Sequence, residues 1–388
     1  MRPTAARPLS DLSELEFVYD FLASRGIHTR RAADHQPAAV DGEWPNQVGD
    51  TPGRIPAGID MVDNAAVIER VGAGIGEHAI EESNLFGICR HLTVRDWPFT
   101  ADKAEEVAKG YKFTEGPTWV AGEKGTGFFV FCDMADDTVF RWDGGAEKPT
   151  ELRKPSGRSV GSCSDGKGNI YNVETAGRRL IKWSVKDGKP TEATDFASKF
   201  EGKKLGGMND CAYNANGSVY ATHGTWFIDA STAEFKHSGV IRVTGSGEVS
   251  KVCDGLEGPN GICFSPDGGT AYVTEYGAGR INAYPVKSDG TFGDKTVFAD
   301  LIELAGKQGI KARKGGGGAD GIRSDNKGNI YSTGPGGIWV LSSKGDVLGH
   351  LPQRGTNLAF GGADGKTLLI TTGGGVMKIG TKNAGAGW

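Results

Sequence analysis

The sequence predicts an all-β fold, a six-bladed β-propeller, and three observations lead to this prediction. Glycine supplies 62 of the 388 residues without a Gly-X-Y period, which is typical of a chain with many tight turns. From about Lys103 onward, short apolar runs alternate with turns of Asp, Asn and Gly. One hairpin pattern recurs six times at a spacing of roughly 40–50 residues, which is the length of a propeller blade.

The repeated hairpin starts in most copies with a polar residue and continues through an apolar run, a turn and a second apolar run. Its six copies are EGPTWVAGEKGTGFFVFCD, VGSCSDGKGNIYNVE, NDCAYNANGSVYATH, NGICFSPDGGTAYVTE, DGIRSDNKGNIYSTG and NLAFGGADGKTLLITT. Segments between the copies, such as GRRLIKWSV and GRINAYPV, leave room for four strands in each unit. We expect an early strand near Val107–Phe113 to complete the last blade.

The first hundred residues have a different texture from the repeats. The segment PLSDLSELEFVYDFLASRGI places apolar residues near helical spacing, which predicts a short helix. The residues after it are rich in Pro, Gly and charge, as in unstructured segments. We therefore expect residues 1–102 to form a weakly helical or disordered extension and residues 103–388 to form the catalytic propeller.

Charge and hydropathy exclude several classes of partner. The formal net charge is −4, and no basic block or long apolar run is present, so neither nucleic acid nor a membrane is an expected partner. The N-terminus lacks the apolar run of a signal peptide, so the sequence as written predicts a cytoplasmic protein. A true start further downstream would instead allow export to the periplasm or medium. We expect a monomer or a weak dimer that acts on a small molecule.

The polar residue that opens each hairpin is the main functional signal. The first strand of each propeller blade lines the central channel, so residues at the equivalent position of every copy face the same point. At this position the six copies carry Glu115, Val160, Asn209, Asn260, Asp320 and Asn357. Buried carboxylates are costly unless they are compensated, and a bound cation would compensate them. Oxygen ligands favour Ca²⁺, then Mg²⁺ or Mn²⁺, whereas Zn²⁺ usually takes nitrogen or sulfur. Capping of turns is the alternative role for these residues.

The motifs FTEGPTW, MNDCAYNANGSVYAT, GPNGICFSPDGGTAYVTE and ADGIRSDNKGNIY resemble the gluconolactonase/regucalcin family in collinear order. The resemblance implies a six-bladed propeller of metal-dependent lactonases. It implies that Glu115, Asn260 and Asp320 are metal ligands and that Asn209 is a fourth ligand or a substrate contact. Val160 and Gly207 depart from the family pattern, so the substrate pocket is expected to differ.

The predicted activity is metal-dependent opening of a lactone, with Asp320 as the catalytic base. A further catalytic candidate, His223, follows the third hairpin and could move a proton. The residues expected to contact substrate are Glu174, Arg178, Trp226 and Glu275. Two alternatives stay open: a non-catalytic ligand-binding propeller with a structural cation, and a phosphotriesterase-type hydrolase.

Overall fold

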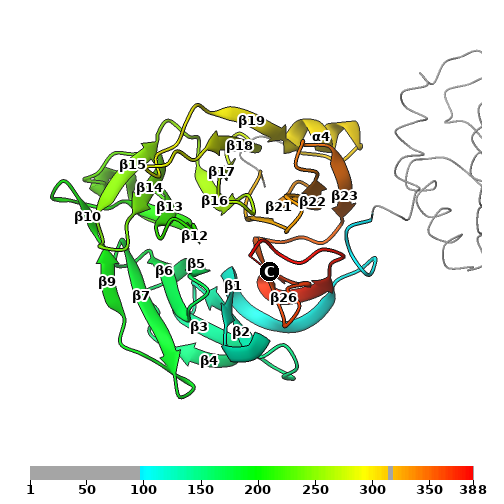
Figure 1. The fold of residues 1–388 in the computed structure, drawn as a ribbon, viewed down its shortest axis with the longest axis horizontal. Helices are drawn as coiled ribbons and strands as arrows, with labels where there is room; N and C mark the ends of the chain where they lie inside the picture. The colour runs from blue at the N-terminus through cyan, green and yellow to red at the C-terminus, as the bar shows by residue number, and fades with distance from the viewer. Residues whose placement is uncertain (1–96, 313–317, 388) are drawn as a thin grey trace, which may run out of the picture. The chain divides into compact units, whose positions relative to one another are not determined.

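The computed structural model describes residues 97–312 and 318–387, which form an almost entirely β structure (Figure 1). The short helix and the extension expected before residue 97 lie outside the described residues. Within the described part, no helix is long and apolar enough to cross a membrane.

The first and last long strands of the described chain pair with each other. Strand β1 (Glu105–Ala121) runs antiparallel to β26 (Gly373–Gly380), with Ala108 opposite Val376. This pairing confirms the expected completion of the last unit by an early strand. It places β1 inside a seven-stranded sheet of order β24-β25-β26-β1-β2-β3-β4. The other members are β24 (Asn357–Gly361), β25 (Thr367–Thr371), β2 (Gly127–Asp133), β3 (Thr138–Trp142) and β4 (Thr150–Arg153).

The remaining strands form smaller antiparallel sheets in chain order. One sheet contains β5 (Ser159–Ser164), β6 (Asn169–Glu174), β7 (Arg179–Lys186), β8 (Lys189–Pro190) and β9 (Thr194–Ala197). A two-stranded ribbon, β10 (Lys199–Phe200) and β11 (Lys203–Lys204), follows it. The next sheet contains β12 (Gly207–Tyr213), β13 (Val219–Gly224), β14 (Gly239–Val243) and β15 (Val249–Cys253).

Two further sheets of four strands complete the described chain. The first contains β16 (Pro259–Phe264), β17 (Thr270–Glu275), β18 (Arg280–Pro285) and β19 (Thr296–Asp300). The second contains β20 (Ile322–Ser324), β21 (Ile330–Gly334), β22 (Gly337–Leu341) and β23 (Val347–Leu351). Between them lies the helix α4 (Leu301–Lys307), which the sequence analysis did not anticipate. The Asp300 carboxylate begins this helix by accepting from the backbone N–H groups of Ile302 and Glu303.

The sheets lie around a common centre, where the inner strands meet (Figure 1). Strands β1, β5, β12, β16, β20 and β24 contact one another in this order, and β24 also contacts β1. Apolar side chains fill the spaces between sheets: Val160 and Met208 belong to one buried cluster, Tyr272 and Ile322 to another. Because each sheet buries its faces against its neighbours, this arrangement is consistent with a propeller.

The hairpin assignments from the sequence are confirmed by the strand pairs. Pro259–Phe264 pairs with Thr270–Glu275, and Asn357–Gly361 pairs with Thr367–Thr371. Just ahead of the expected boundary at residue 103, Phe99 is buried in the core, and its backbone bridges to Thr381. Residues directly before 103 therefore pack with the sheets.

Glycines after the polar residues let neighbouring inner strands approach closely. A Cβ atom on Gly261 would lie 2.5 Å from the carbonyl oxygen of Asp320, and one on Gly116 would overlap the carbonyl oxygen of Val160. Gly116 also has a φ of +53°, which L side chains rarely adopt. The glycine of the repeat is therefore required by contact between sheets.

We expect Gly116→Ala to lower the free energy of unfolding by about 2–4 kcal/mol, because backbone strain and overpacking add together. Gly166→Ala is the matched control: its φ is +70°, but a Cβ there would have no atom within 4 Å. The free energy of unfolding of this control should fall by about 1 kcal/mol, from the backbone strain of a positive φ alone. Urea denaturation measures both values, and equal losses would contradict the close-approach argument.

Candidate metal and active site

Irregular strand pairing turns the polar residues toward the centre of the sheets. The register between first and second strands shifts at four hairpins, between Glu115 and Thr118, Ser159 and Ser162, Met208 and Cys211, and Pro259 and Ile262. An extra residue bends the strand and changes the direction of its side chains. Glu115, Asn209 and Asn260 all lie at these shifts.

Two carboxylates from different sheets share one electrostatic environment at the centre. Glu115 on β1 is buried, and its Oε2 accepts from the Gly116 N–H at 2.7 Å and from Asn357 Nδ2 at 3.1 Å. Burial raises the pKa of Glu115 to about 7; these hydrogen bonds oppose the shift, and the Asp210 charge adds to it. Burial, then the charges of Glu115 and Asp210, raise the pKa of Asp320 well above its usual range. Glu115 and Asp320 therefore lie within range of each other's charge.

The two asparagines present oxygen atoms that no protein donor satisfies. The Asn260 side chain hydrogen-bonds to the Asp320 carboxylate and opposes the rise in its pKa. Within the described structure, Oδ1 of Asn209 and Oδ1 of Asn260 are buried and have no hydrogen-bond partner. Such atoms cost about 1–3 kcal/mol each unless something binds them. A hard cation would satisfy these oxygens, so the residues present fit a Ca²⁺-type ligand set.

The candidate cation ligands include as many carboxamides as carboxylates. In the described ranges, no three His, Cys, Asp or Glu side chains form a metal-ligating group. The proposed set contains only two such residues, Glu115 and Asp320, and asparagine oxygens complete it. A site of this composition carries less negative charge than one made of carboxylates alone.

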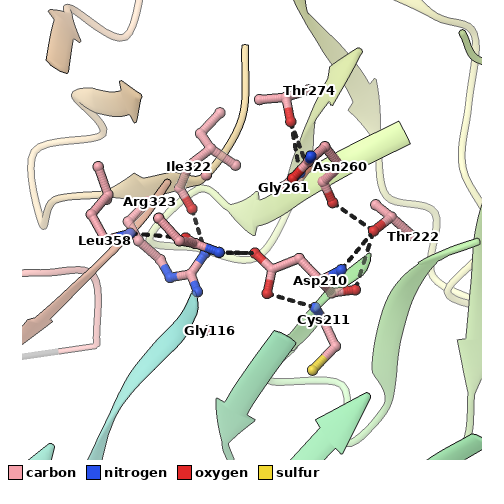
Figure 2. A network of polar contacts seen from close by, with 12 residues as sticks. Gly116, Asp210, Cys211, Thr222, Asn260, Gly261, Thr274, Ile322, Arg323 and Leu358 are labelled. Carbon is pink, nitrogen blue, oxygen red and sulfur yellow. Dashed lines mark hydrogen bonds and ion pairs between the residues drawn. The ribbon is translucent and has the colours of Figure 1, made fainter. Parts of the chain in front are cut away.

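Three residues that were not among the predicted metal ligands, Asp210, Arg323 and Asn357, connect this centre. Figure 2 shows Asp210 and Arg323 facing each other. Asp210 on β12 is fully buried, and its Oδ2 lies 3.2 Å from Nη1 of Arg323 on β20. The same Oδ2 accepts from Asn357 Nδ2 at 3.2 Å, and that nitrogen also donates to Glu115. The signal for Arg323 was an arginine at the position of the hairpin where the preceding copy has Cys263, because a charge in an inner strand needs a buried partner.

His223 lies in the third sheet and is fully buried. Its Nε2 accepts from the Gly206 N–H at 2.7 Å, and its Nδ1 lies 2.9 Å from the carbonyl oxygen of His237, which requires the proton on Nδ1. Burial lowers the pKa of His223 to about 4, so the ring is neutral at pH 7. Both nitrogens bind the backbone, and this geometry leaves no nitrogen for the expected proton transfer.

The neutral ring of His223 predicts acid sensitivity. Its pKa is lower in the folded chain than in the unfolded chain, so unfolding takes up a proton between about pH 6.5 and 4. Stability is therefore retained above pH 6.5 and declines below it, by about 2 kcal/mol at pH 5 from this group. We expect His223→Gln to flatten that part of the curve in urea titrations from pH 5 to 8. An unchanged slope would contradict the assignment.

The polar groups of three predicted substrate contacts are occupied by protein partners. Glu174 is buried between Arg153 (2.8 Å) and Arg179 (2.6 Å). Glu275 accepts from the Glu257 N–H at 2.7 Å and from Asn282 Nδ2 at 2.6 Å. Arg178 donates to the carbonyl oxygen of Thr232 at 3.0 Å. These contacts brace connections between strands, and contact with substrate stays a prediction for all three residues.

Trp226 lies next to Asn260. Its indole N–H donates at 2.6 Å to the carbonyl oxygen of Pro259, the residue before Asn260. The ring is half-buried and meets Tyr276 edge-on at 5.8 Å between centroids. Gly207 leaves room for the Trp226 backbone, which a side chain at that position would overlap. Trp226 therefore lies near Asn260, and contact with substrate stays a prediction for this residue too.

The all-β sheets around an oxygen-rich centre are consistent with a protein of the propeller type. The chain belongs to the SMP-30/gluconolactonase/LRE-like family, whose model matches residues 113–374. The family resemblance drawn from the sequence motifs is thereby confirmed.

Individual relatives agree with this membership. The chain is 27% identical over 305 residues to the gluconolactonase of Zymomonas mobilis, which covers 72% of this chain and 82% of that protein. It is 26% identical to the pentonolactonase XacC of Haloferax volcanii, over 67% of this chain and 81% of the relative. The solved gluconolactonase XC5397 of Xanthomonas campestris shares the fold, with a TM-score of 0.63 and 24% identity over 74% of this chain and 92% of that one.

Proposed function

We propose that this protein is a lactonase that depends on a divalent cation held at the centre of a six-bladed propeller. The observation that carries the proposal is the pair of buried, unpartnered carboxamide oxygens of Asn209 and Asn260. Asn260 hydrogen-bonds to Asp320, and Asn209 precedes Asp210, whose charge acts on both Glu115 and Asp320. Relatives named gluconolactonase and pentonolactonase support lactone opening as the reaction. The substrate is then a small cyclic ester.

The residues of the chain supply binding, orientation and proton transfer. When bound, the cation would polarise the lactone carbonyl and neutralise charge that develops on its oxygen. Asp320, which the Asn260 carboxamide orients, accepts a proton from water as the water oxygen attacks the carbonyl carbon. The ring carbon–oxygen bond then breaks, and the proton passes to the leaving oxygen. Trp226 forms a wall against the substrate ring.

Lactone hydrolysis releases a proton at neutral pH, so a pH-stat assay tests the proposal directly. The purified full chain, first freed of metal, should open members of a panel of aldonolactones and aliphatic lactones only after Ca²⁺, Mg²⁺ or Mn²⁺ is added. The same panel should contain a phosphotriester. Turnover of the phosphotriester alone would favour the phosphotriesterase-type alternative. Cation binding without any turnover would favour the non-catalytic propeller and overturn the proposal.

A further inference from the structure

The Asp210 carboxylate occupies the centre of the described sheets, yet protein donors occupy both of its oxygens. Oδ1 accepts from the Cys211 N–H at 2.9 Å. Oδ2 accepts from Arg323 Nη1 at 3.2 Å and from Asn357 Nδ2 at 3.2 Å. These donors come from strands β12, β20 and β24, so the contacts join inner strands of three sheets. Figure 2 shows the contacts of Asp210 with Cys211 and Arg323.

Asn357 has only one orientation that satisfies its surroundings. Its Oδ1 accepts from the Leu358 N–H at 2.9 Å, so Nδ2 is the end that faces the two carboxylates. Nδ2 donates to Asp210 Oδ2 and to Glu115 Oε2, so it bridges the two side chains. Glu115 accepts two hydrogen bonds, one from Asn357 Nδ2 and one from the Gly116 N–H, and both go to Oε2. Oε1 is therefore the oxygen of Glu115 left for a cation.

Arg323 supplies the positive charge that this arrangement needs. Without it, three carboxylates, those of Glu115, Asp210 and Asp320, would share one largely buried region. Its side chain is only 17% exposed, and Nη1 also donates to the carbonyl oxygen of Ile322 at 2.6 Å, which fixes the guanidinium. A buried charge of this kind is strongly destabilising when its partner is removed.

We propose that Arg323 is a positioning residue that keeps the Asp210 carboxylate out of the cation's ligand set and holds it as the anchor for Asn357 and Glu115. This inference rests on the cation site of the proposed function. Asp210 directly follows the candidate ligand Asn209, so a free Asp210 carboxylate would compete for the cation. The ion pair removes that competition without adding net charge.

Two single variants and their combination test the proposal in the full-length protein. Arg323→Met leaves Asp210 uncompensated beside the site, so Ca²⁺ affinity should rise by about tenfold or more. Asp210→Asn leaves the charge of Arg323 uncompensated, and affinity should fall by about tenfold or more. The double variant removes both charges and should bind Ca²⁺ within about threefold of wild type. Titration calorimetry with Ca²⁺ at pH 8 measures all four proteins.

A purely structural role would not produce opposite changes that cancel in the double variant. Arg141→Met is the control, because Arg141 forms an ion pair with the exposed Asp143 and should leave Ca²⁺ affinity unchanged. If Arg323→Met fails to fold, Asp210→Asn and the double variant still test the cancellation. Equal affinities for wild type and both single variants would overturn only this inference. A wild-type protein that binds no divalent cation would overturn the inference and the proposed function together.

Discussion

Asp320→Asn is expected to lower lactone turnover by a factor on the order of 10²–10⁴, because general-base assistance is worth about that much. The carboxamide has nearly the same shape but cannot accept the proton from water. The fold should persist, since burial and the charges of Glu115 and Asp210 already disfavour the ionised form of Asp320. In metal-free protein the melting temperature should therefore stay equal to that of wild type or rise.

The control for this substitution is Asp364→Asn, which changes an exposed residue in a hairpin turn that accepts from the Lys366 N–H. It should leave turnover unchanged. The pH-stat assay gives the rates, and circular dichroism gives the melting temperatures. A full rate for Asp320→Asn would show that another group takes the proton, and a collapsed fold would show that Asp320 is structural.

Removal of the cation is expected to abolish turnover and to lower thermal stability at pH 8. The charge of Glu115 raises the pKa of Asp320, and the charge of Asp210 raises the pKa of both, so without a cation negative charges repel at the centre of the sheets. A ligand present at 100 times its dissociation constant stabilises the folded state by about 2.7 kcal/mol. Adding Ca²⁺ to chelated protein should therefore raise the melting temperature, with Mg²⁺ and Mn²⁺ less effective.

Glu115→Gln shows whether this stabilisation arises at the proposed centre. The substitution keeps the shape of the side chain and removes one negative charge, so the melting shift with Ca²⁺ should become much smaller. Glu303→Gln, which removes an exposed charge paired with Lys307 on α4, is the matched control and should keep the full shift. Undiminished turnover by fully chelated wild-type protein would refute the cation requirement.

Much of the fold could be predicted because its signals are local. The hairpins around Asn260 and Asn357 follow from alternating apolar residues and turn residues, and their strand pairs are confirmed. Four cysteines lie in apolar strand segments of the same kind and are buried and free: Cys132, Cys163, Cys211 and Cys263. Helix α4 was not anticipated, because it is only seven residues long and directly follows a strand.

The candidate site was only partly accessible from the sequence. Glu115, Asn260 and Asp320 open their hairpins at one phase of the repeat, and this phase brings their environments together. Asp210 and Arg323 fall outside that phase, and 113 positions of sequence separate them. His223 was expected to move a proton, whereas its ring is buried with both nitrogens bound to the backbone.

The sequence by itself determined the repeated hairpins, their order and the oxygen-bearing side chains that open five of the six copies. Apolar alternation, turn chemistry and residue type are properties of short segments and can be read without any partner. The tertiary structure decided which side-chain oxygens lack hydrogen-bond donors and which arginine pairs with Asp210. It also decided which carboxylate oxygen of Glu115 remains available to a cation. These features depend on contacts between strands of different sheets, which no short segment specifies.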